Sequence, residues 1–365
     1  MENQENSFKY FAANLWAIQL TLFDTLEDEL GVLGETEKNW INTCSVVLKS
    51  QYFAKYLWSG NGRPPSNRIA IFKMFILKAI SNYATTKETL NVIRLSPVLR
   101  RLCGWQLISD IPSESTISRA FNQFSQDGIA DALHSELVSS ALGRNGIMHV
   151  SHDSSAIEAR EKGERIKQTE EEMAKTSLGA QRKRTADENF KLLPQHCDWG
   201  IKRNSKGKTY TWKGYKLHLC CSDGDIPICG FLSSANMHDS KAMIPMMQKA
   251  SEHFDYFYDI ADAGYDAEEI RQASILMNHA PIIDRNPRRG EKNVDDIGGR
   301  NVGIIDASTC RYYQRSSIER VFSHLHDAHG GRFVRVRGHK KVFLHLMFGL
   351  IVITAEQLFR AAALM

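Results

Sequence analysis

Three acidic residues stand at positions where a folded chain can bring carboxylates together. Asp153 follows the β-favouring run GIMHVSH, Asp262 ends the run FDYFYDIAD, and Glu319 falls in a helical pattern near the C-terminus. Neighbouring strand ends of one sheet can place two carboxylates side by side, and a helix packed across the sheet can present a third. Carboxylate oxygens bind hard divalent cations. Two such ions can activate a nucleophile and stabilise the leaving oxygen of a phosphoryl displacement. The set therefore predicts metal-dependent phosphoryl transfer.

No single member of this set is specific, because the chain has 42 Asp and Glu residues. Asp153 alone is typical of a turn or a cap, and Glu319 alone is typical of a solvated helix face. Asp262 competes with its neighbours Asp259 and Asp266 for the same role. Only the combination of the three positions favours a catalytic site.

The N-terminal region, residues 1–140, is expected to be mostly helical. The stretch IAIFKMFILKAISNYA has apolar residues at helical spacing. Farther on, LCGWQL precedes IPSESTISRAFNQF, in which Pro112 begins a helix with Ser113 or Ser115 as the N-cap. A helix, a Gly-containing turn and a capped helix predict a helix-turn-helix that contacts DNA through Ser118 and Arg119. An ordinary helical hairpin is the alternative.

Residues 141–365 have the pattern of an α/β domain. The stretch YTWKGYKLHLCC alternates as a strand does, SDGD is typical of a hairpin turn, and strands and helices then alternate. A charged segment at about 158–208 interrupts this pattern and is expected to be an exposed helical insertion or a mobile linker. The chain closes with two helical segments, at 316–328 and 340–363.

The bulk properties are compatible with a nucleic-acid partner without requiring one. The 365-residue chain has a net charge of +4. Its seven cysteines show no Cys-x2-Cys spacing, which argues against a disulfide framework or a cysteine-based zinc site. A zinc site at His324, His326 and His329 is not expected either, because on a helix the first two point about 200° apart.

The N-terminus shows no signal peptide, and the apolar run from Val342 to Ile353 is shorter than the roughly 20 residues of a membrane span. No membrane partner and a cytoplasmic location are expected.

The stretch YYQRSSIERVFSHLH resembles the third motif of insertion-sequence DDE transposases, Tyr-x2-Arg-x3-Glu-x6-Lys, with Tyr312, Arg315 and Glu319 on its spacing. The run from Asp262 to Asp266 (DAGYD) is similar to the second motif of that family, and HDSSAI, with Asp153, to the first. NMHDS at 236–240 looks like the Asn-x-His-Asp segment found between the first two motifs. Residues 62–124 resemble the DNA-binding region that precedes the catalytic core.

This resemblance implies a ribonuclease-H-like core, a mixed five-stranded sheet flanked by helices. It implies two Mg²⁺ or Mn²⁺ ions per active site, held by Asp153, Asp262 and Glu319. The implied reaction is cleavage at the ends of an insertion sequence to leave a 3′-hydroxyl, which then attacks target DNA. The implied partners are terminal inverted repeats, target DNA and further copies of this chain on paired ends, in a bacterial nucleoid.

The expected DNA contacts fall in the third motif and after it. The resemblance assigns Tyr312 and Arg315 to the DNA near the scissile phosphate, although Arg315 can also pair with Glu319 in the same helix. His326 stands where the family has a lysine, and imidazole is neutral for much of the time near pH 7. The stretch RFVRVRGHKK, with Arg332, Arg335, Arg337 and Lys340, predicts a strand or loop that contacts phosphates; a solvated basic loop is the alternative.

Other functions stay open at this point. A related metal-dependent nuclease or resolvase would hydrolyse DNA without joining it. A decayed transposase would only bind DNA, and His326 favours that reading whereas the three intact acids oppose it. If the chain were only a structural α/β protein, the spacing of the third motif would have arisen by chance.

Overall fold

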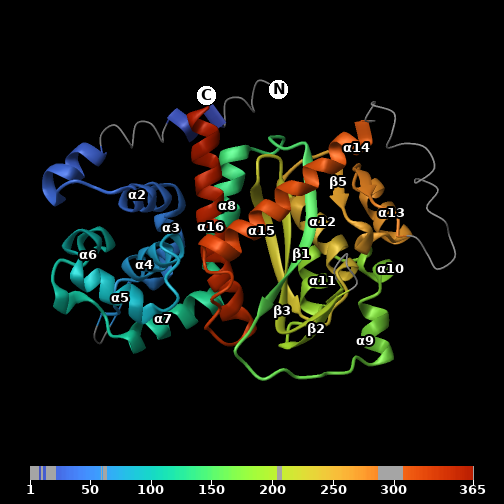
Figure 1. Ribbon diagram of the computed structural model, residues 1–365, viewed down its shortest axis with the longest axis horizontal. Helices are drawn as coiled ribbons and strands as arrows, with labels where there is room; N and C mark the ends of the chain where they lie inside the picture. Colours follow the sequence, from blue (N-terminus) through green and yellow to red (C-terminus); the bar gives the residue numbers. More distant parts are fainter. Residues whose placement is uncertain are drawn as a thin grey trace. The chain divides into compact units, whose positions relative to one another are not determined.

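A computed structural model of the protein describes residues 8–9, 11–13, 22–58, 60, 64–203, 208–286 and 307–364. The chain folds into two compact units (Figure 1). Unit 1 comprises residues 1–143, 159–161 and 323–365, and unit 2 comprises 144–158 and 162–322.

Unit 1 is helical, as expected. Three of its helices begin at residues whose side chains cap them. Asn67 accepts hydrogen bonds from first-turn amides of α4 (Arg68–Ile80), and Thr85 and Ser113 each accept one from the first turns of α5 (Thr86–Leu95) and α7 (Glu114–Asp127). The N-cap of α7 predicted at Ser113 or Ser115 is therefore Ser113. The helices are α2 (Glu35–Val47), α3 (Ser50–Phe53), α4 (Arg68–Ile80), α5 (Thr86–Leu95), α6 (Pro97–Cys103), α7 (Glu114–Asp127), α8 (Ile129–Leu142) and α16 (His339–Ala363).

Helix α16 is the core of unit 1. It packs against α2, α4, α7 and α8, and the ring of Phe348 lies 4.8 Å from that of Phe72 and 5.3 Å from that of Phe75. By length and composition alone it could cross a membrane, but most of its apolar stretch is buried inside the protein. Its hydropathy is therefore that of a core helix.

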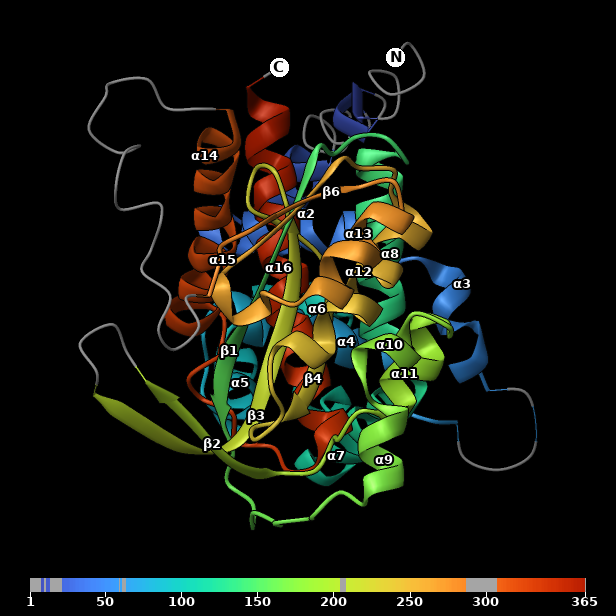
Figure 2. The ribbon, with the colours of Figure 1, turned by 90° about the vertical axis from the view of Figure 1, so that its right-hand side faces the viewer.

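Unit 2 is built on one mixed sheet (Figure 2). Strand β3 (Thr209–Ser222) pairs antiparallel with β1 (His149–Glu158) on one side. On its other side it pairs with β4 (Ile226–Ser234) and, over its first residues, with β2 (Asp198–Arg203). Strand β5 (Tyr258–Ala261) pairs parallel with β1 and with β6 (Ala280–Ile283). The order β4-β3-β1-β5-β6 is the expected mixed five-stranded sheet of a ribonuclease-H-like domain, and β2 adds a sixth strand.

The helices of unit 2 cover this sheet. Helix α12 (Ser240–His253) packs on β3 and β4 and against α11 (Ala186–Leu192) and α13 (Glu268–Leu276). Met243, Met247, Ile270 and Ile283 are buried together in this layer. The third motif lies on α14 (Ala307–Tyr312), a short 3-10 turn, and α15 (Ser316–Ala328). The boundary between the two units falls inside α15, between Phe322 and Ser323.

The charged segment at 158–208 is more ordered than a mobile linker. Its described part forms α9 (Glu170–Lys175), α10 (Leu178–Gln181), α11 (Ala186–Leu192) and strand β2; residues 204–207 lie outside the described part. The buried Asn189 side chain donates to the Gln181 carbonyl at 2.9 Å and to Gln248 of α12 at 3.1 Å. These buried amide contacts fasten the segment to the sheet's helical layer, which the charge pattern did not predict.

The two compact units are a division by packing, and the predicted domains at 1–140 and 141–365 stay a prediction. Residues 323–365 pack with the N-terminal helices in unit 1. The reason is α16, whose apolar side chains are buried by the N-terminal helices.

Candidate active site

Asp153 lies on β1, and Asp262 directly follows the adjacent parallel strand β5. Ser151 of β1 pairs with Ile260 of β5, and each acid lies two residues beyond that pair. Parallel neighbours of one sheet are about 4.8 Å apart and point to the same face. The structure therefore places the two carboxylates at the same level, where β5 ends.

Asp262 is held by the turn that it begins. Its side chain accepts a 2.9 Å hydrogen bond from the amide of Gly264, and it caps a short 3-10 turn in which Tyr265 is buried. Asp262 remains half-buried, so one carboxylate oxygen is fixed by the backbone while the group stays open to a ligand.

Arg315 links Asp153 to Glu319. One guanidinium nitrogen lies 3.5 Å from Asp153 Oδ2, and another lies 2.6 Å from Glu319 Oε1, one helical turn farther on. The Asp153 side chain is 17% exposed and that of Glu319 is 54% exposed. Through Arg315, Glu319 of α15 is therefore linked to Asp153 of β1, while the Glu319 side chain itself stays exposed to solvent.

The electrostatics of Asp153 fit a cation-binding carboxylate. Burial and the charge of Asp262 raise its pKa to about 6, against the backbone amide of Ser154 and the charges of Lys202 and Arg315. A divalent cation between the two acids would remove this penalty, and its preferred ligands are carboxylate oxygens. Among the described residues, the carboxylates of Asp153, Asp262 and Glu319 do not form a group whose oxygen atoms all lie within 4.8 Å of one another. Arg315 contacts two of them, Asp153 and Glu319.

A fourth acid, Asp284, stands at the same edge and was not predicted. It follows β6 directly, and the last residue pair of β5 and β6 is Ala261 with Ile283, so Asp284 is placed beside Asp262. The hydroxyl of Tyr312 donates to Asp284, and burial together with this bond raises the Tyr312 pKa. The pattern that identified Asp262, an acidic residue directly after a strand, also applies to Asp284 and could have identified it.

The two acids that compete with Asp262 have other roles. Asp259 is fully buried and accepts hydrogen bonds from four side chains, those of His152, Tyr256, Ser274 and His279. Burial raises its pKa, but the hydrogen bonds and charges of His152 and His279 hold that pKa well below its usual range. Asp266 is paired with Arg271 at 2.8 Å. Of the three, Asp262 alone stands beside Asp153.

The Asn-x-His-Asp segment supports the site from the opposite face of β1. Lys216 Nζ contacts Asp239 Oδ1 at 2.9 Å and the Met237 carbonyl at 2.8 Å. Burial raises the Asp239 pKa, but the charges of His218 and Lys216 and a hydrogen bond from Ser154 lower it overall. Asp239 thus anchors the residue that follows Asp153.

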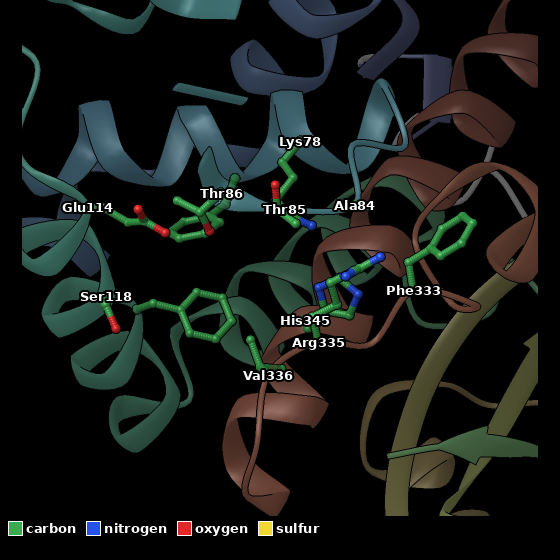
Figure 3. A pocket seen from close by; sticks show the side chains of 12 residues that line it. Lys78, Ala84, Thr85, Thr86, Glu114, Ser118, Phe333, Arg335, Val336 and His345 are labelled. Carbon is green, nitrogen blue, oxygen red and sulfur yellow. The ribbon is translucent and has the colours of Figure 1, made fainter. Parts of the chain in front are cut away.

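The predicted DNA contacts outside the third motif gather in unit 1. Ser118 and Arg119 lie on the exposed face of α7. A pocket of about 240 Å³ is lined by Ser118 and Glu114 of this helix and by Arg335 of the basic stretch (Figure 3). Lys78 also lines it, and burial and the charge of Arg335 lower its pKa to about 8.

The basic stretch is a loop rather than a strand, and helix α16 begins at its end. Arg332, Arg335, Arg337 and Lys340 are exposed. Lys340 Nζ contacts Gln126 of α7 at 2.9 Å, whereas Arg332 pairs with Asp327 at 2.6 Å. The loop and α7, which are about 200 residues apart in sequence, therefore form one surface, here called the basic surface and made of Ser118, Arg119, Arg335, Arg337 and Lys340.

His326 does not supply a constant positive charge. It is half-buried on α15, and burial together with the charge of Arg332 lowers its pKa. The imidazole is therefore neutral near pH 7, unlike a lysine at this position.

Comparison with known families identifies two regions of the chain. Residues 144–355 match the family model of the transposase DDE domain, and residues 38–123 match that of a transposase domain designated DUF772. Neither the curated proteins nor the solved structures contain a match.

Proposed function

Because the chain belongs to the DDE transposases of the insertion-sequence type, whose members use divalent metal ions and act on DNA, we propose that it is an active transposase. It cleaves DNA at the ends of an insertion sequence and joins the resulting 3′-ends to target DNA. The observation that carries this proposal is the register of Asp153 and Asp262, with Glu319 linked to Asp153 through Arg315.

Asp153, Asp262 and Glu319 are the residues proposed to hold two Mg²⁺ or Mn²⁺ ions. Their oxygen donors suit these cations. Such ions, when bound, activate the attacking water or 3′-hydroxyl and stabilise the leaving oxygen. The carboxylates must be ionised to bind a cation, so the raised pKa of Asp153 makes metal binding sensitive to pH.

Arg315 and Tyr312 are proposed to position the DNA backbone. Arg315 contacts Asp153 and Glu319 in this structure. With cations held by these acids, its planar guanidinium would be available to bind a phosphate in a bidentate manner. The Tyr312 hydroxyl donates to Asp284, which fixes its ring, and Arg315 lies over that ring at 5.9 Å. The two side chains thus form one platform beside the carboxylates.

Binding of the terminal inverted repeats is proposed to use the basic surface of unit 1. Its arginines and lysine contact phosphates, and the exposed polar face of α7 contacts base edges, as a recognition helix does. The supporting observation is the pocket that Ser118 shares with Arg335. Two or more copies of the chain assemble on paired ends, in association with the nucleoid.

Strand cleavage and joining on a labelled duplex with the element's own ends test this function. Asp153→Asn, Asp262→Asn and Glu319→Gln are each expected to abolish metal-dependent cleavage and joining, while end binding changes little. Asp255→Asn is the matched control, because Asp255 forms an exposed pair with Arg144 at 2.9 Å and touches none of the three acids. Full cleavage by any of the three variants would refute the assignment of that residue.

A second function, DNA binding without catalysis, is favoured by one observation. His326 replaces the motif's lysine and is neutral near pH 7. Binding of the ends by the wild-type chain with no cleavage in Mg²⁺ or Mn²⁺ would support this decayed form. Cleavage without joining would instead indicate a nuclease.

A further inference from the structure

A cluster of side chains of the types that can bind a metal ion lies in unit 1 and shares no residue with the candidate active site. It consists of His324 on α15, His329 just after that helix, and Glu356 on α16. The Nε2 atoms of the two histidines are 3.3 Å apart, and Glu356 Oε2 lies 3.5 Å from His329 Nε2 and 3.8 Å from His324 Nε2.

These separations are those of ligands around one small ion. Zinc binds imidazole nitrogen and carboxylate oxygen at about 2.0–2.2 Å in a tetrahedron, which places neighbouring ligand atoms about 3.3–3.5 Å apart. Two of the three observed distances lie in this range, and the third exceeds it by a few tenths of an ångström. A rotation of the partly exposed His324 ring is enough to close it.

The surroundings already orient two of the ligands. His329 is buried, and its Nδ1 lies 3.2 Å from the carbonyl oxygen of Ala79, which can only accept a hydrogen bond. This contact is satisfied by a proton on Nδ1, and it turns Nε2 toward the cluster, where that atom can bind a metal ion. Glu356 accepts a 2.9 Å hydrogen bond from Asn39 at Oε1, which leaves Oε2 for a metal. Metal-binding histidines and carboxylates are commonly fixed in this way.

We propose that His324, His329 and Glu356 bind a first-row transition metal ion, zinc in preference to magnesium. Two imidazoles with one carboxylate suit zinc, whereas magnesium prefers oxygen ligands alone. The His324 side chain is 32% exposed, so water can fill the fourth position. The ion ties the end of α15 to α16 and, through Asn39 and Ala79, to α2 and α4, so its role is to stabilise unit 1.

The spacing of the histidines in the sequence did not predict this site, for a geometric reason. His324 and His326 do point apart on their helix, and His326 is absent from the cluster. His329, however, lies beyond the end of α15, where the helical wheel no longer applies. The third ligand, Glu356, comes from a helix that begins ten residues later.

The test is calorimetric titration of the chelator-treated, full-length chain with ZnCl₂ in excess MgCl₂. A Glu319→Gln background removes one ligand of the acidic site. One zinc per chain is expected, and Glu356→Gln and His324→Ala are each expected to weaken binding at least about 100-fold. His326→Ala, on the same helix but outside the cluster, should bind as the parent does. Asn39→Ala is expected to weaken binding about 10-fold.

Two measurements distinguish the loss of a zinc ligand from a folding defect in the variants. Circular dichroism checks that each variant is folded, and His324→Ala is the mildest change because that ring is partly exposed. Zinc should also raise the Tm of the parent and not that of His324→Ala. Absence of saturable zinc binding, or equal binding by folded Glu356→Gln and His324→Ala, would mean that the three side chains only share protons in a hydrogen-bonded cluster.

Discussion

The guanidinium of Arg315 donates a 2.6 Å hydrogen bond to the carboxylate of Glu319, one helical turn farther along the chain. The pairing is more than a local helix contact, because a second nitrogen of the same group reaches toward Asp153 on the sheet. One side chain thus spans two of the three acids, and it sets the position of Glu319 relative to the strands.

The position of Arg315 predicts a specific loss of rate. Arg315→Ala is expected to slow single-turnover cleavage about 100-fold, since a displacement of about 1 Å in the reacting groups has this effect. Arg315→Lys should recover only part of the rate, because an ammonium group has no planar fork. The measurement is cleavage at saturating DNA and Mg²⁺. A lysine variant as fast as wild type would show that charge alone is required.

The raised pKa of Asp153 predicts how the stability of the metal-free chain depends on pH. The pKa of Asp153 is about 6 in the folded chain and 3.8 ordinarily. At a pH between these two values, the folded chain keeps a proton on Asp153 that the unfolded chain has lost. The ionised group therefore costs stability above about pH 6, and this cost disappears as the pH falls toward 3.8. Asp153→Asn should raise the free energy of unfolding by about 1–3 kcal/mol at pH 8 and by nearly nothing at pH 4.

Urea denaturation with chelator present measures this difference, with Asp255→Asn as the control. A gain that is equal at both pH values would show that the effect of the substitution is not electrostatic. With metal present, cleavage should fall as the pH drops below about 6, because protonated Asp153 cannot bind a cation.

The basic surface predicts a measurable change in salt dependence. Removing one protein–phosphate interaction makes the slope of log K against log salt shallower by about 0.9. Arg335→Ala and Arg337→Ala are each expected to have this effect on end binding. Lys175→Ala removes an exposed charge of unit 2, paired with Glu171 at 2.6 Å, and should leave the slope unchanged. Unaltered slopes in both arginine variants would place the DNA elsewhere.

His326 predicts a gain of function. Burial keeps its imidazole neutral near pH 7, so His326→Lys adds a permanent charge whose long side chain can extend to solvent. The salt slope of end binding should steepen by about 0.9 and cleavage should increase. His326→Gln, which stays neutral, is the control. If lysine and glutamine variants behave alike, this position does not face DNA.

The amino-acid sequence by itself determined the local elements and the family. The apolar spacing of α4, the N-cap at Ser113 and the alternation of β3 depend on neighbours within a few residues, so they can be read from the chain. The spacing of Tyr312, Arg315 and Glu319 is local in the same sense. Membership of the transposase family, indicated by that spacing, was confirmed by the family models.

The tertiary structure decided which side chains meet. Asp259, Asp262 and Asp266 are equivalent in the sequence, and only the register of β1 with β5 sets Asp262 beside Asp153 and buries Asp259 among its donors. The contact of α7 with the basic loop and the approach of Glu356 to His329 likewise join residues far apart in the chain. Such contacts depend on strand register and helix packing, which are set by the burial of the whole core and not by any local pattern.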